Sequence, residues 1–498
     1  MDKIKEKLKK INFKYLHIAI ILIGIIFISI SIFHANMWFD ESYSVAMARH
    51  TFTEIWQIGE SDVHPMLYYF CLHILYLIFG NNIIIYRIFS VAMIALLGIL
   101  GYTHIRKDFD EKTGLIFSFL AFFLPMTAQY AGEIRMYPLG MLLGTIMAIY
   151  AYRIYKGKIN KSTYFIFGIS SLLLAYTHYY GLMLAGIVNL LVFVYLCKNA
   201  KQRKSDLKKF TITAVLQVLA YIPCLIILVK QITGVAAGFW AKLSFPETIY
   251  DVLTLQYRGN LTFQPIILST IFYAYIVYMV YQTQKQERKP ATWCFMVYTA
   301  IILIALLASL CIKSVILVNR YLLIVTGLLI FGLAFFMAKD TKKWRVITIC
   351  AIIIVVSIIS NISIIKENYN PHNKDCVKYL QENIQDNDII VYSNVLNGAI
   401  IVTDLSSNIN ITSYFYNKDD WKVYESYKSY SPYMEIKATL EEILDNYSGR
   451  VWLIEGENTH SLQDEIESKY NITKLEDKQF ISKYKDYRYT IELIEVYR

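Results

Sequence analysis

Long apolar runs separated by short polar segments follow one another through the first three quarters of the chain. Most runs are close to the roughly 20 residues that cross a bilayer as a helix, so the pattern predicts about eleven membrane spans. The expected spans lie at about residues 14–34, 86–105, 114–131, 137–154, 163–177, 182–197, 210–229, 265–281, 291–311, 321–338 and 346–365.

Composition supports a polytopic α-helical membrane protein. Of the 498 residues, 56% are hydrophobic and only 18% are charged, which excludes an ordinary soluble protein of this size. The net charge of +10 is concentrated in short loops, which indicates membrane orientation and argues against a nucleic-acid partner. The seven cysteines are scattered, with neither metal-site spacing nor a disulfide framework. The Lys-rich start precedes a long run that has no small-residue cleavage site, so we expect an uncleaved first span.

The basic loops predict the orientation of the chain. The N-terminal lysines and the segment Lys198–Lys209 place those parts in the cytoplasm, and the loop after the first span then lies outside. In that loop we interpret Pro65–Phe79 as an amphipathic helix in the outer interface, because it carries His73 and three tyrosines. Counting it as a span would put Arg106 and Lys107 outside.

The composition becomes polar at Lys366, which predicts two domains: a transmembrane domain, 1–365, and an extracytoplasmic soluble α/β domain, 366–498. The second domain contains no Gly-rich phosphate loop, and packing or acceptor docking is the role we favour for it. The segments expected as strands are Asp388–Ser393, Ile409–Phe415, Arg450–Gly456 and Tyr489–Arg498, and those expected as helices are Met434–Asn446 and Ser461–Tyr470.

Polar residues that are unusual near span ends gather on the expected outer side. They are Asp40, Glu41, Asp62, His64, Glu133, Arg135, Tyr137, His178, Lys313 and Arg320. The asymmetry is imperfect, because the inner loop after the second span also holds acids. Taken singly, each residue has an ordinary explanation: Arg135 can snorkel to the interface, and His178 can be a satisfied structural histidine.

Together these residues supply a carboxylate, cations and tyrosine hydroxyls on one side of one membrane. Transfer of a sugar from a lipid phosphate needs such a set. Phosphate is already a good leaving group, so cations matter more than a general acid, and Arg binds phosphate oxygens in a bidentate way. A carboxylate can take the proton of the acceptor hydroxyl as general base.

The ordered motifs resemble a known family. They are the acidic pair Asp40-Glu41 after the first span, His64-Pro65 with Leu67-Tyr68-Tyr69, Arg135 with Tyr137, Thr177 to Tyr180, and Arg320-Tyr321. In this order they resemble the C-type superfamily of integral-membrane glycosyltransferases, in particular the protein O-mannosyltransferase and aminoarabinose-transferase-like group. The resemblance covers roughly residues 10–340, most of the spanning region.

The resemblance implies Asp40 as general base, with Glu41 as its partner or substitute. It implies an inverting enzyme with a polyprenyl-phosphate-linked sugar as donor, and a protein, lipid or cell-wall glycan as acceptor, working in the cytoplasmic membrane. The residues that it assigns to donor phosphate or sugar are His64, Tyr68, Tyr69, Arg135, Tyr137, His178 and Arg320. One departure is Met66, where many relatives have a second proline that constrains the loop.

Three alternatives stay open at this point. No cofactor is expected, but Asp40 and Glu41 with His64 could hold a divalent cation through oxygen and nitrogen ligands. A transporter or flippase of lipid-linked or amphipathic substrates should show broken spans that meet at mid-membrane. The spans here are mostly uninterrupted and the charges gather at one edge, which favours the transferase. A membrane scaffold that displays the C-terminal domain would not need Asp40.

Overall fold

The structure is a computed structural model that describes residues 2–237, 245–254, 264–284, 287–312, 316–393, 395–405, 411–416, 425–456, 462–481 and 488–497. Lys313 lies outside these ranges. The chain forms two compact units. The first, which we call the helical unit, comprises Met1–Phe33, Val63–Tyr68 and Arg87–Ile364. The second, the sheet unit, comprises His34–Asp62, Tyr69–Tyr86 and Ile365–Arg498.

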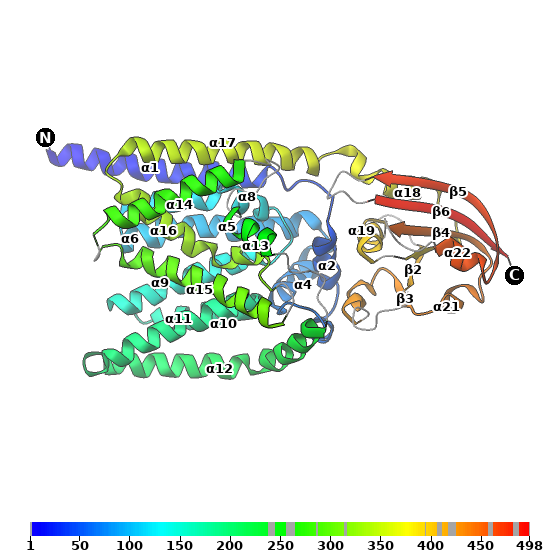
Figure 1. Cartoon of the computed structure of the whole chain (residues 1–498), viewed down its shortest axis with the longest axis horizontal. Helices are drawn as coiled ribbons and strands as arrows, with labels where there is room; N and C mark the ends of the chain where they lie inside the picture. Colours follow the sequence, from blue (N-terminus) through cyan, green and yellow to red (C-terminus); the bar gives the residue numbers. More distant parts are fainter. Residues whose placement is uncertain are drawn as a thin grey trace. The chain divides into compact units, whose positions relative to one another are not determined.

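The helical unit is built from elongated helices, seen on the left of Figure 1. They are α1 (Asp2–Ser29), α5 (Ile83–Leu100), η1 (Gly101–Ile105), α6 (Arg106–Asp108), α7 (Glu111–Phe123), α8 (Pro125–Ala131), α9 (Tyr137–Lys156), α10 (Thr163–Thr177), α11 (Tyr179–Lys198), α12 (Ala200–Ala237), α13 (Phe245–Thr254), α14 (Gln264–Gln282), α15 (Lys289–Ile312), η3 (Asn319–Val325), α16 (Thr326–Lys339) and α17 (Lys343–Asn368). The first four residues of α5 and the last four of α17 belong to the sheet unit.

Six helices in the described part of the chain are long and apolar enough to cross a membrane. They are Ile83–Asp108, Tyr179–Lys198, Ala200–Ile232, Lys289–Cys311, Asn319–Lys339 and Lys343–Asn383, and the bent pair α7–α8 makes a seventh if it is one span. The expected count of eleven is therefore not confirmed. One reason is length: α10 has 15 residues, about 22 Å of helix, which is less than the roughly 30 Å of a bilayer core.

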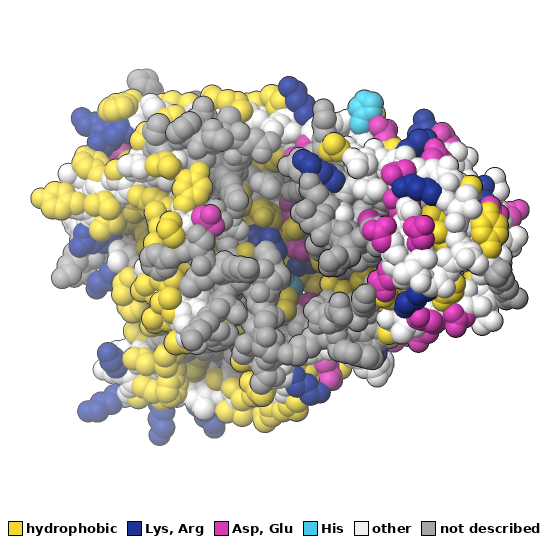
Figure 2. All heavy atoms as spheres, turned by 45° about the vertical axis from the view of Figure 1, so that its right-hand side comes forward, with side chains coloured by type: hydrophobic (Ala, Val, Ile, Leu, Met, Phe, Trp, Pro, Cys, Tyr) yellow, Lys and Arg dark blue, Asp and Glu magenta, His cyan; other side chains and the backbone are white. Residues whose placement is uncertain are grey.

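Pro125 lies at a bend between α7 and α8. Leu124 before it is extended (φ −66°, ψ 129°), as expected for a residue that precedes proline, and the axes of α7 and α8 differ by 60°. The surface of the unit suits a bilayer, because hydrophobic side chains cover its sides while Lys and Arg gather at its left-hand end (Figure 2). We call this the lysine-rich end, and it includes Lys156 at the end of α9, Lys289 at the start of α15 and Lys339 at the end of α16. The chain is a multi-pass membrane protein, as the composition predicts.

The sheet unit contains a C-terminal α/β domain with one mixed sheet of the order β3-β2-β1-β4-β6-β5. Parallel pairing joins β1 to β2 and β4, and β2 to β3, whereas β6 is antiparallel to β4 and β5. The strands are β1 (Ile389–Tyr392), β2 (Thr412–Tyr416), β3 (Glu435–Lys437), β4 (Gly449–Gly456), β5 (Asn471–Ile481) and β6 (Arg488–Tyr497). The helices are η4 (Pro371–Lys374), α18 (Asp375–Asn383), α19 (Val395–Leu405), η5 (Lys428–Tyr430), α21 (Glu441–Leu444) and α22 (Leu462–Glu467).

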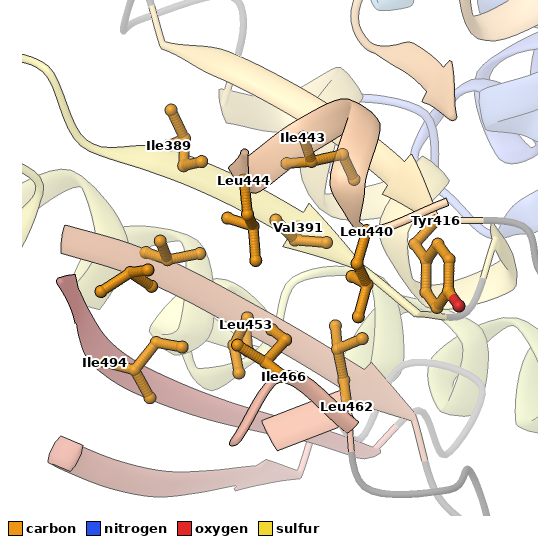
Figure 3. Packing of buried hydrophobic residues seen from close by; sticks show 12 residues of the cluster. Ile389, Val391, Tyr416, Leu440, Ile443, Leu444, Leu453, Leu462, Ile466 and Ile494 are labelled. Carbon is orange, nitrogen blue, oxygen red and sulfur yellow. The ribbon is translucent and has the colours of Figure 1, made fainter. Parts of the chain in front are cut away.

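Both faces of the central strands are covered. On one face, Ile389 and Val391 of β1 join Leu453 of β4 in an apolar cluster under α21 and α22 (Figure 3). On the other face Trp452 is fully buried and donates its indole N–H to Asp388 at 2.8 Å. Side chains alternate between the faces of a strand, so a strand covered on both faces carries apolar residues at consecutive positions.

The strands expected around residues 388–393, 409–415, 450–456 and 489–498 are confirmed, and so is the helix expected at 461–470. The helix expected over Met434–Asn446 is wrong in its first half, where Glu435–Lys437 pair with β2 as strand β3. The helix α21 begins only at Glu441, after a turn in which Thr439 accepts the Glu442 N–H at 3.3 Å and Glu442 accepts the Ala438 N–H at 3.0 Å.

Strand β5 was not predicted. It lies at the edge of the described sheet, beside β6, and its side chains are at least partly exposed. Its Lys474 bonds to Asp477 at 2.8 Å and to Glu492 of β6 at 2.9 Å. Charged side chains protect an edge strand against further pairing, but they also erase the apolar alternation by which a strand is predicted.

Three helices of the first loop complete the sheet unit: α2 (Phe39–Ala48), α3 (Phe52–Gly59) and most of α4 (Leu67–Phe79). The predicted interfacial segment is thus a helix. Within the sheet unit α2 packs against α19 and η5. The loop that carries the acidic pair is therefore compact with the C-terminal domain.

Candidate active site

Five predicted donor-binding residues of the helical unit come from helix ends. His64 lies in the turn before α4, Arg135 in the turn before α9, and Tyr137 begins α9. His178 separates α10 from α11, and Arg320 lies in η3. Since side chains at helix ends are not required for packing along the helices, such positions can present polar groups to a ligand.

His178 is held by the helix that it caps. Its backbone is extended (φ −164°, ψ 148°), which ends α10, and its Nδ1 accepts the backbone N–H of Tyr180 at 3.1 Å at the start of α11. An accepting Nδ1 assigns the proton of a neutral ring to Nε2. This Nε2 is buried and has no hydrogen-bond partner within the described ranges. A ligand oxygen would satisfy it.

Tyr321 joins the predicted residues into one aromatic cluster. Its ring centroid lies 4.7 Å from that of His178 and 5.5 Å from that of His64, and the two histidine rings are 4.9 Å apart. Tyr137 lies 6.1 Å from His178. His64 also has a buried Nδ1 without a partner in the described part of the chain. Two buried imidazoles with unmet hydrogen-bonding capacity thus lie side by side.

Two arginines lie beside the tyrosine rings of this cluster. Arg135 is only 3% exposed, and its guanidinium carbon lies 5.9 Å from the Tyr137 ring, as that of Arg320 lies 5.8 Å from the Tyr321 ring. Burial, followed by electrostatic repulsion between a protonated His64 and His178, Arg135 and Arg320, lowers the pKa of His64 well below its ordinary value. The cluster therefore combines uncharged imidazole rings with the permanent positive charge of two arginines. This combination suits an anion such as phosphate.

Acidification should destabilise the fold through His64. Because its folded pKa lies below that of the unfolded chain, the unfolded state binds more protons, and stability falls as the pH drops below about 6.5. The contribution of His64 to the free energy of unfolding changes by about 1 kcal/mol per pH unit.

Thermal unfolding from pH 7.5 to pH 5.0 should therefore be less acid-sensitive in His64→Gln than in the wild type. The exposed His372, whose side chain is 73% accessible, offers His372→Gln as control, and equal acid sensitivity in all three proteins would contradict this account.

The acidic pair lies in the sheet unit at the start of α2, where negative charge is favoured by the helix dipole. The two acids differ. Glu41 is 1% exposed and its Oε2 accepts the Trp38 N–H at 3.4 Å, so it helps to begin the helix. Asp40 is partly exposed, and Ser44 donates to its backbone oxygen at 2.9 Å. Asp40 is thus the more accessible acid of the pair.

The remaining two predicted residues, Tyr68 and Tyr69, belong to different units. Tyr68 is fully buried in the helical unit and lies 6.1 Å from the Phe89 ring. Tyr69 belongs to the sheet unit, where its hydroxyl donates to Asp62 at 3.2 Å. Their donor-binding roles stay predictions. The structure adds Tyr321 and Tyr180 to the cluster, and both stood in the motifs that carried the resemblance.

Sequence reasoning also missed Tyr430 of η5, a fully buried residue of the sheet unit. Its hydroxyl lies 3.1 Å from the Ser42 Oγ on α2, and its ring lies 6.2 Å from Tyr43. Two further contacts join the residues after α2 to the same segment. The Nε2 of His50 lies 2.9 Å from the Ser429 carbonyl oxygen, and the guanidinium carbon of Arg49 lies 4.5 Å from the centre of the Tyr433 ring. The helix of the acidic pair is thus held by the segment Ser429–Tyr433.

Within the described ranges, no three side chains of His, Cys, Asp or Glu gather as metal ligands. The hypothesis of a divalent cation at Asp40, Glu41 and His64 therefore gains no support from such a cluster.

Comparisons with known proteins identify the fold. No family model and no curated protein matches the chain. Among solved structures, it is similar to ArnT from Cupriavidus metallidurans in the apo state, with a TM-score of 0.63 and 9% identity over 97% of this chain and 98% of that chain. ArnT bound to undecaprenyl phosphate matches with a TM-score of 0.60 at the same identity and coverage. The fold implied by the resemblance to the aminoarabinose-transferase-like group is confirmed.

Proposed function

We propose that the chain is a glycosyltransferase that moves a sugar from a polyprenyl-phosphate-linked donor to an acceptor nucleophile at the outer face of the cytoplasmic membrane. The observation that carries the proposal is the pair of buried imidazoles, His64 and His178, beside Arg135 and Arg320 in an apolar helical protein. ArnT, which shares the fold, has been crystallised with undecaprenyl phosphate. A lipid phosphate would supply the acceptor oxygens that the cluster needs.

The reaction follows from the roles of these groups. Arg135, Arg320 and the His178 Nε2–H donate to the phosphate oxygens of the donor. Asp40 removes the proton of the acceptor hydroxyl, whose oxygen attacks the anomeric carbon from the face opposite the phosphate. The bond between that carbon and the phosphate oxygen breaks, and its electron pair leaves with the lipid phosphate. The configuration inverts, and the cations stabilise the charge on the departing group.

The proposal includes an orientation. The N-terminus and the lysine-rich end lie in the cytoplasm, and residues 366–498 form a soluble domain outside. Residues 1–365 supply the donor site. Cysteine labelling with a membrane-impermeant reagent in intact cells tests the orientation: a cysteine in place of the exposed Ser468 should react from outside, and one in place of Lys204 should not.

Replacing Arg135 should weaken donor use selectively. Arg135→Ala removes charge-assisted hydrogen bonds to phosphate of about 1.5–3 kcal/mol, so the donor KM should rise about 10-fold to 100-fold while the acceptor KM stays within about twofold. Arg135→Lys keeps the charge without the planar fork and should give a smaller loss. Steady-state kinetics in proteoliposomes measures both constants.

Arg203 provides the matched control for this prediction. It pairs with Asp206 at 2.8 Å and donates to the Ile154 carbonyl at 2.7 Å, at the lysine-rich end. Arg203→Ala should leave the donor KM unchanged. A donor KM that is equal in wild type and Arg135→Ala would remove Arg135 from the phosphate site.

The function is tested by supplying the purified full chain in proteoliposomes with a panel of undecaprenyl-phosphate sugars and a membrane extract as acceptor. Label that moves to a new acceptor, with release of undecaprenyl phosphate, supports the transferase. Label that crosses the bilayer on its original lipid would instead identify a flippase. Mass spectrometry of surface glycans and glycoproteins, with and without the chain, then identifies the acceptor.

A further inference from the structure

A second internal space lies at the other end of the helical unit. It is a cavity of about 520 Å³ enclosed chiefly by α9, α11, α15 and α16. Most of its wall is aliphatic and aromatic, with Val192 on α11, Val297 on α15 and Phe331 on α16. Its volume lies within the roughly 300–1,000 Å³ of sites that bury small ligands.

A packed layer separates this cavity from the aromatic cluster. Along α9 the cluster holds Tyr137 and the cavity begins at Thr145, about 12 Å further on. Between them, a Cβ atom on Gly140 would collide with Ile324, and one on Gly144 would lie 3.0 Å from Leu184. Both Ile324 and Leu184 are fully buried. The cavity is therefore not an extension of the donor site.

Three lysines surround the lysine-rich end of the cavity: Lys156 at the end of α9, Lys289 at the start of α15 and Lys339 at the end of α16. All three are exposed, and within the described ranges none forms an ion pair with an acid. They are therefore available to an anion from outside the chain.

The acids beside these lysines are mostly engaged elsewhere. Asp108 binds Arg153 at 2.8 Å and Lys158 at 3.5 Å. Asp110 accepts the backbone N–H of Thr113 at 2.8 Å. Glu287 is the third acid of the wall. With Arg153 and Lys158 included, cations outnumber acids at this end.

The side of the cavity is open towards the surroundings of the helices. Trp293 and Tyr155 line it, yet they are 47% and 41% exposed. Amphipathic rings of this kind prefer the boundary between hydrocarbon and headgroups. An elongated apolar group can thus enter from the bilayer while its polar end stays beside the lysines.

We propose that this cavity binds one acyl chain of an anionic phospholipid, with the lipid phosphate against Lys156, Lys289 and Lys339. Each buried methylene contributes about 0.8 kcal/mol, and basic pockets between membrane helices bind phospholipid headgroups. A purely apolar metabolite would leave the three lysines without a role. The site does not depend on the proposed transfer reaction, because the packed layer separates the two.

Native mass spectrometry of the full chain tests the proposal. Protein from nanodiscs of equal parts phosphatidylglycerol and phosphatidylcholine should retain one phosphatidylglycerol after detergent exchange. Ala148→Trp fills the cavity from α9 and should reduce the retained lipid at least tenfold. Leu190→Trp, at a 60% exposed position of α11 outside the cavity wall, should retain it like the wild type.

Two further measurements keep the test decisive if Ala148→Trp misfolds. Replacing Lys156, Lys289 and Lys339 together by Gln should abolish the preference for phosphatidylglycerol over phosphatidylcholine. A photoreactive phosphatidylglycerol should label peptides of α9 and α15. Three results would each overturn the proposal. They are labelling confined to other helices, unchanged lipid retention in a folded Ala148→Trp, and displacement of the bound lipid by undecaprenyl phosphate but not by phosphatidylglycerol.

Discussion

Replacing Asp40 with asparagine is expected to lower kcat for sugar transfer by about 10²–10⁴-fold, the usual contribution of a positioned general base. The amide has nearly the shape of the carboxylate but cannot accept the proton of the acceptor hydroxyl. The fold should persist, because Ser44 donates to the backbone oxygen of Asp40, which asparagine also has. Turnover of an undecaprenyl-phosphate sugar in proteoliposomes measures the loss, and the unfolding temperature and yield of membrane-inserted protein check integrity.

Glu41→Gln is the matched control for the assignment of the base. Its amide oxygen can still accept the Trp38 N–H that Glu41 accepts at 3.4 Å, so the start of α2 should be kept and kcat should change by no more than a few fold. If Glu41→Gln loses more activity than Asp40→Asn, Glu41 is the base. If Asp40→Asn turns over like the wild type, neither the base nor the proposed mechanism survives.

The sequence predicts where the polar residues of the cluster lie along the chain and that they share the outer side, but it does not predict which of them come into contact. Each polar residue of the cluster follows or precedes an apolar run, which the sequence shows directly. Which helix ends come together depends on packing between residues far apart, such as His64 with His178. The 3-10 turn at Asn319–Val325, which presents Arg320 and Tyr321, has no sequence signal of its own.

The secondary structure, too, was only partly predictable from the sequence. Strand β1 was predicted from its apolar residues, whereas the charged edge strand β5 was not. The predicted number of spans is not confirmed, because an apolar run does not specify a helix of sufficient length, as α10 shows. The contact between Ser42 and Tyr430 joins residues separated by 388 positions, and no local pattern predicts a contact at that distance.

This long-range contact leads to the second large effect. Tyr430→Ala is expected to destabilise the sheet unit by about 3–5 kcal/mol, as for other buried aromatic residues cut to alanine. The Tyr430 ring lies 6.4 Å from Phe39 and 6.2 Å from Tyr43, on either side of Asp40 in α2. Loss of the ring should therefore free the helix that carries the proposed base. We expect a lower unfolding temperature, faster proteolysis between Trp38 and Asp62, and lower kcat with little change in donor KM.

Tyr430→Phe separates packing from hydrogen bonding. Burial raises the pKa of the Tyr430 hydroxyl well above its ordinary value, so the group stays protonated and neutral. Removing it forfeits only the contact with Ser42, about 0.5–1.5 kcal/mol. The cost should lie at the low end, because the Ser42 hydroxyl also donates to the Phe39 carbonyl at 2.8 Å. Near-normal activity in Tyr430→Phe together with a large kcat loss in Tyr430→Ala would show that the aromatic ring positions α2. Full activity and unchanged proteolysis in Tyr430→Ala would show instead that α2 keeps its place without the C-terminal domain.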